Sequence, residues 1–133
     1  WDVYRGIVRP VTVKRIAVRY INRFDLPSAS VDLKEYLRTG PEISSDLPQG
    51  MVGFFFQVTL ALTDISAMVN LTETVVESPL PDGVSLVFDI DLYRTEDLPS
   101  DDAGLWRLLE DFREKKDAVF EACITEKTRE MIR

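Results

Sequence analysis

Residues 13–24 read VKRIAVRYINRF and alternate between two kinds of side chain. One set is Ile16, Val18, Tyr20 and Phe24, and the other is Arg15, Arg19 and Arg23. Because successive side chains of a β-strand point to opposite faces, this alternation predicts a strand with one buried face and one face that carries a row of arginines. Such a strand needs neighbouring strands and a cover over its apolar face.

Three further stretches alternate in the same way, at 51–63, 66–76 and 83–93, with short polar turns between them. Strands at such short spacing predict an antiparallel meander. We expect the inward side chains to be Val52, Phe54, Phe56, Val58, Leu60, Leu62, Ala67, Val69, Leu71, Val75, Val84, Leu86, Phe88, Ile90 and Leu92. We place the first strand beside the fourth, because the arginines of the first then lie against Asp89 and Asp91.

Apolar residues recur at helical spacing between 105 and 123, after a start where Ser100 or Asp101 can cap a helix. Thr125 can open a last short helix, or the long helix can continue through it. A short helix over 31–38 is also expected, because Ser30 can cap it and Gly40 ends it. The predicted fold is α+β: an antiparallel sheet of about four strands, a long C-terminal helix on one face, and a short helix after the first strand.

Composition narrows the function classes. The chain has 133 residues, 45% of them hydrophobic and 29% charged, which predicts one domain spanning 1–133. Its net charge of -7 argues against nucleic-acid and acidic-membrane partners. It shows neither an apolar run of the roughly 18 residues that a membrane span needs nor a signal peptide. The single cysteine, Cys123, favours a cytoplasmic protein with a buried thiol.

The chain contains no histidine, which excludes histidine-based nucleophile systems and histidine metal sites. The remaining candidates are ligand-binding residues on one face of the sheet: Arg15, Arg19, Arg23, Asp89 and Asp91. The aspartates lie about 7 Å apart along their strand and could hold Mg²⁺, and the arginines could bind a phosphate or carboxylate. The alternative is that the two sets neutralise each other across strands. We favour the alternative, because no glycine-rich phosphate loop accompanies the pair, and we expect no cofactor and no metal.

The outward face of the sheet also carries apolar side chains, which are Phe55, Met68, Val87 and Tyr93. Exposed apolar side chains on a sheet face indicate that another surface covers them. We therefore predict an interface here, with a second subunit or with another segment.

The residues Arg15 to Arg23, RIAVRYINR, preceded by Trp1 and Tyr4, resemble a family of uncharacterised, sporadically distributed prokaryotic proteins. Further matches are VDL at 31–33, YL at 36–37, DID at 89–91, Phe120, and IT at 124–125. Members of that family look longer, with an extra N-terminal portion. The resemblance therefore implies that this chain is the C-terminal portion of a longer protein, as a start at Trp1 also does. It implies no activity, cofactor or catalytic residue.

Together these observations favour a non-catalytic interaction or regulatory domain that self-associates or docks on another segment. Its expected partner is a protein or a second copy, with no nucleic acid and no membrane. The alternative is a domain that uses the arginines and aspartates of the sheet face. Such a domain would bind an anion or a nucleotide, or would catalyse metal-dependent phosphotransfer.

Overall fold

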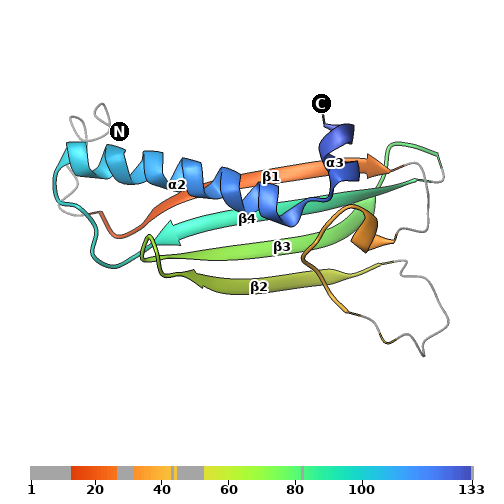
Figure 1. Cartoon of the computed structure of the whole chain (residues 1–133), viewed down its shortest axis with the longest axis horizontal. Helices are drawn as coiled ribbons and strands as arrows, with labels where there is room; N and C mark the ends of the chain where they lie inside the picture. Colours follow the sequence, from red (N-terminus) through yellow and green to blue (C-terminus); the bar gives the residue numbers. More distant parts are fainter. Residues whose placement is uncertain (1–12, 27–31, 43, 45–52, 82, 133) are drawn as a thin grey trace.

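The structure, a computed structural model of the chain, describes residues 13–26, 32–42, 44, 53–81 and 83–132. Figure 1 shows its elements, which are β1 (Ile16–Leu26), η1 (Leu33–Glu35), β2 (Phe55–Leu62), β3 (Ala67–Glu77), β4 (Val84–Arg94), α2 (Asp102–Cys123) and α3 (Glu126–Met131). The first predicted strand therefore begins and ends later than expected, and residues 51 and 52 of the second lie outside the described part.

The four strands form one antiparallel sheet in the order β1-β4-β3-β2. The predicted α+β fold, with a four-stranded antiparallel sheet and a C-terminal helix, is confirmed. The prediction that the first strand lies beside the fourth is also confirmed, because β1 pairs with β4 over its whole length, from Ile16 opposite Arg94 to Leu26 opposite Val84.

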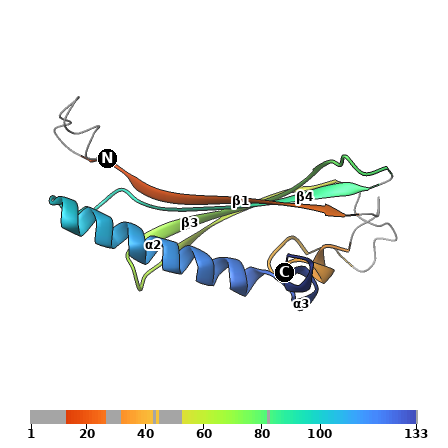
Figure 2. The same cartoon turned by 90° about the horizontal axis from the view of Figure 1, so that it is seen from above.

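One face of the sheet is covered and the other is not. Figure 2 shows η1, α2 and α3 on the same side of the sheet, and no described element on the opposite side. We call the covered side the inner face and the open side the outer face. The core lies between the inner face and α2, and contains Ile16, Phe24, Leu26, Val69, Leu71, Leu86, Phe88, Ile90, Leu92, Leu105, Leu108, Phe112 and Phe120. Each such side chain contributes roughly 1.5–3 kcal/mol when it leaves water.

The cover is uneven across the inner face. Helix α2 packs chiefly on β1 and β4, so β2 lies beyond it at the far edge of the sheet (Figure 1). The inward side chains of β2 are consequently half-buried, and Leu60 keeps 43% of its surface exposed. No described helix is long and apolar enough to cross a membrane.

The short helix predicted over 31–38 is not confirmed, because the described residues there form a single 3-10 turn, Leu33–Glu35. The backbone after this turn bonds instead to the junction between α2 and α3. The N–H of Arg38 donates to the carbonyl of Cys123 at 2.7 Å, and the N–H of Thr125 donates to that of Tyr36 at 3.1 Å. A backbone that pairs in this extended way cannot also continue a helix.

Thr125 separates the two C-terminal helices, as one of the two alternatives predicted. Its hydroxyl oxygen accepts a hydrogen bond from the N–H of Thr128 at 3.3 Å, which caps α3. The hydroxyl of Thr128 donates to the carbonyl of Tyr36 at 2.6 Å. At the other end, Asp101 is the N-cap residue of α2, one of the two candidates named from the sequence.

Candidate functional site

The outer face carries the arginines and aspartates singled out in the sequence, and it brings four of them together. Arg19 contacts Asp89 through two nitrogens, the closer at 2.5 Å, and Arg15 lies 3.1 Å from Asp91. The pairs are diagonal rather than directly opposite, because the register places Arg19 opposite Asp91. The hydrogen bond and charge of Asp89 raise the pKa of the Arg19 guanidinium.

Arg15 reaches its aspartate across an aromatic ring. Its guanidinium carbon lies 4.7 Å from the centre of the Tyr93 ring, a cation–π distance. Tyr93 therefore has one side of its ring occupied by the arginine, which accounts for its being only partly exposed.

Arg23 does not join the other two arginines. It bonds to Asp25 on its own strand at 3.1 Å, to the carbonyl of Glu77 at 3.1 Å and to the hydroxyl of Ser85 at 3.2 Å. The Ser85 hydroxyl in turn donates to Asp25. The hydrogen bond from Ser85, and then the one from Arg23, lower the pKa of the Asp25 carboxyl.

These contacts bear on the chemistry that the outer face could perform. Arg19 contacts both carboxylate oxygens of Asp89, and Arg15 contacts one oxygen of Asp91, so each aspartate is paired with a cation of the chain itself. Among the described residues, no group of three or more histidine, cysteine, aspartate or glutamate side chains is placed to hold a metal ion. The arrangement supports cross-strand neutralisation over a phosphate or magnesium site.

The apolar residues predicted as an interface lie in two rows that cross the outer face. In one row, Met68 of β3 lies directly opposite Tyr93 of β4. In the other row, Thr74 of β3 lies between Phe55 of β2 and Val87 of β4. Phe55 keeps 69% of its surface exposed and Met68 keeps 37%, whereas Val87 is half-buried. Both rows run from β2 across β3 to β4, and the most exposed of the four predicted residues, Phe55, lies on β2.

The outer face divides into two halves of different composition. The register assigns three arginines and three aspartates to the β1–β4 half and its strand ends. The outward residues of the β2–β3 half carry no charge; they are Phe55, Gln57, Thr59, Ala61, Met68, Asn70, Thr72, Thr74 and Val76. We call this set the uncharged half-face.

Polar groups of the uncharged half-face bond mostly to one another. Thr59 donates to Asn70 at 2.6 Å, and Gln57 donates to Thr72 at 3.1 Å. The hydroxyl of Thr74 donates to the carbonyl of Phe54 at 2.9 Å. Groups that are already hydrogen-bonded lose little when a second surface displaces water from them. The half-face can therefore be covered at small cost.

One buried acid was missed in the sequence. Glu73 occupies an inward position of β3, between Leu71 and Val75, and its surface is 0% exposed. Neither carboxylate oxygen has a hydrogen-bond partner among the described residues. Burial raises the pKa of this carboxyl to about 7. The available signal was the strand alternation itself, which places position 73 on the apolar side.

Cys123 lies close enough to Glu73 for the two to interact. The thiol is buried, as predicted, at the end of α2. Burial raises its pKa, the hydrogen bond with Thr39 opposes that shift, and the charge of Glu73 adds to it. A thiol held in its neutral form is a poor nucleophile.

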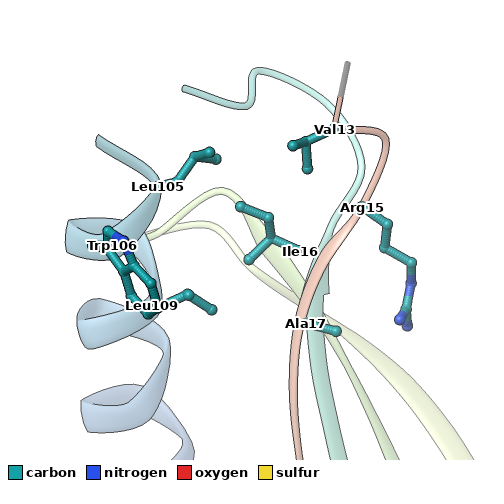
Figure 3. Close-up of a pocket in the computed structure, with 7 residues that line it drawn as sticks. All are labelled: Val13, Arg15, Ile16, Ala17, Leu105, Trp106 and Leu109. Carbon is teal, nitrogen blue, oxygen red and sulfur yellow. The ribbon is translucent and has the colours of Figure 1, made fainter. Parts of the chain in front are cut away.

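An apolar pocket of about 230 Å³ lies between the first turns of α2 and the start of β1 (Figure 3). Its lining residues are Val13, Arg15, Ile16, Ala17, Leu105, Trp106 and Leu109. Figure 3 shows the Arg15 side chain on the side of the strand away from α2. The pocket lining thus presents apolar side chains and no carboxylate or thiol, which does not support a catalytic site.

Comparisons of the chain with protein-family models, with curated proteins and with solved structures found no match. The resemblance of residues 15–23 to a prokaryotic family stays a prediction.

Proposed function

We propose that this chain is a non-catalytic interaction module that self-associates on the β2 side of the sheet, which carries the uncharged half-face. The observation that carries the proposal is the composition of that surface. In a chain with 29% charged residues, nine outward side chains on two neighbouring strands carry no charge. The centres of protein interfaces are depleted in charged residues and enriched in aromatic residues and methionine, and here Phe55 and Met68 lie exposed.

The occupant that fits best is a second copy. The charges on the outer face balance, three arginines against three aspartates, so the net charge of -7 comes from the rest of the chain. Two copies that meet at their uncharged halves therefore bring no like charges into contact. The repulsion between the negative charges elsewhere on the two copies is weak, because physiological salt screens it. The engaged state of Asp89 and Asp91 supports this proposal over a phosphotransfer site.

The test is sedimentation velocity on the full chain over a range of concentrations, with two matched variants. Phe55→Lys places a charge in the uncharged half-face. Ile21→Lys places the same charge on the same face, at a side chain that is 58% exposed on β1. We expect a wild-type dimer whose dissociation constant rises about tenfold or more in Phe55→Lys and stays unchanged in Ile21→Lys.

Two results would overturn the proposal. A wild-type chain that sediments as a monomer at every concentration rules out self-association. A dimer that both lysine variants weaken equally places the interface elsewhere than on the β2 side of the sheet. Thermal unfolding of both variants, followed by circular dichroism, checks that each remains folded.

A further inference from the structure

The edge of β2 that faces away from β3 pairs with no strand in the described part of the chain. Figure 1 shows the four strands side by side, with β2 at the margin of the sheet and β3 on its inner side. The pairing with β3 is regular from Phe55 opposite Thr74 to Leu62 opposite Ala67, without a bulge. Residues 53–63, GFFFQVTLALT, contain neither a charge nor a proline.

Edge strands usually carry a device that prevents pairing with another chain. The common devices are charged side chains, proline, a bulge, a very short strand, or a covering segment. The eight residues of β2 show none of these in the described part of the chain. Its free backbone N–H and C=O groups are therefore a template for another strand.

We propose that β2 pairs antiparallel with β2 of a second copy, about a twofold axis perpendicular to the sheet. The two sheets then become one sheet of eight strands, and the two uncharged half-faces become one continuous surface. This inference rests on the proposed self-association and specifies how it occurs. It places both α2 helices on the same side of the joined sheet.

Side-chain composition makes the strand complementary to itself. In an antiparallel pair, directly opposed residues lie on the same face of the sheet. Because faces alternate along a strand, two opposed copies of β2 must pair odd-numbered residues with odd and even-numbered residues with even. The two registers with the longest overlap are centred on Val58 and on Thr59. In each of these two registers, apolar residues lie opposite apolar residues on the inner face, and uncharged residues lie opposite uncharged residues on the outer face. Neither register therefore places like charges opposite each other.

The uneven cover over the inner face supports the same arrangement. Leu60 is 43% exposed because α2 packs chiefly on β1 and β4. In the register centred on Thr59, Leu60 lies opposite Val58 of the second copy. Burial of these side chains against their copies adds an apolar contribution to the backbone hydrogen bonds.

The test is disulfide trapping in the full chain with Cys123 replaced by alanine. Single cysteines are introduced at Val58 and Thr59, the two possible centres of the strand pair, and at Thr72 as a control. Thr72 shares the outer face with Thr59 but lies one strand further in. We expect a disulfide-linked dimer, reversed by reductant, from one of the two β2 positions and none from Thr72.

The outcomes separate this inference from the proposed function. Trapping from Thr72 but from neither β2 position shows a dimer packed face to face, which overturns the edge pairing and leaves self-association standing. A dimer in sedimentation that none of the three cysteines traps also overturns the edge pairing. A chain that stays monomeric overturns both.

Discussion

The two edge strands of the sheet, β1 and β2, are protected very differently. β1 carries arginines along its outer side and lies under α2, whereas β2 has no charge and lies beyond the helix. An arginine-bearing edge disfavours pairing with another chain, and an uncharged regular edge permits it. In the described part of the chain, the difference leaves β2 as the edge whose side chains permit pairing.

The acidic side chains of the sheet also differ in whether they have a partner. On the β1–β4 half, Asp25, Asp89 and Asp91 each have an arginine within ion-pair distance. On β3, Glu73 points inward and has no partner among the described residues. On the outer face, the hydrogen bonds from Ser85 and Arg23 lower the pKa of Asp25, whereas burial raises the pKa of Glu73 on the inner face.

The largest expected change in the free energy of unfolding comes from replacing a leucine of an edge strand with alanine. Leu26 of β1 is 1% exposed, so Leu26→Ala should lower the free energy of unfolding by about 2–5 kcal/mol. Leu60→Ala on β2 should cost less than half as much, because much of that side chain is already in water. Urea unfolding at a protein concentration below the dimer range measures both. Equal costs would mean that α2 protects the two edges alike.

The next effect concerns Glu73 and pH. Its pKa is raised from 4.5 to about 7, so the folded state retains a proton that the unfolded state releases. This carboxyl's contribution to stability is therefore complete below about pH 4.5 and is lost as the pH rises to about 7. Relative to Glu73→Gln, the wild type should lose about 3 kcal/mol of unfolding free energy over that range.

Parallel urea titrations of the two proteins between pH 4.5 and pH 8 measure this difference. Asp25→Asn is a suitable control, because its carboxyl has a lowered pKa and its contribution changes below that window. A constant difference between wild type and Glu73→Gln across the window would show that Glu73 is ionised throughout.

A smaller effect, on the stability of the dimer, is expected when β2 receives a charged side chain like those on β1. Thr59→Lys sets two lysines close together across the proposed twofold axis, which should weaken the dimer several-fold. Thr72→Lys adds the same charge one strand further in and should leave the dimer nearly unchanged. Sedimentation equilibrium of both variants gives the ratio of dissociation constants. If Thr72→Lys weakened the dimer more, the contact would be through the face of the sheet.

The smallest effect should come from the exposed ion pair between Arg19 and Asp89. Arg19→Gln should change the free energy of unfolding less than Leu60→Ala does, because water and salt screen an exposed pair. The change should shrink further in 1 M NaCl. Chemical unfolding at low and high salt measures it, and a loss as large as that of Leu26→Ala would contradict a purely screened interaction.

Alternation in the sequence was enough to predict the strands and the open face, because the period of two survives in all four strands. The order of β1 and β4 followed from matching Arg19 to the aspartates of β4. The turn at Leu33–Glu35 could not be predicted, because its continuation pairs with Ile124, which is remote in sequence. Glu73 was missed because a charged side chain on a strand is usually solvated, although the alternation places position 73 on the apolar side.

The position of β1 beside β4 has a consequence for the order of folding. Strands β2, β3 and β4 contact their sequence neighbours, whereas β1 must wait for β4, the last strand to be synthesised. Loop closure over that distance is slow compared with hairpin formation. Until β4 is made, β1 lacks its native strand partner, and arginines along a strand disfavour pairing with another chain.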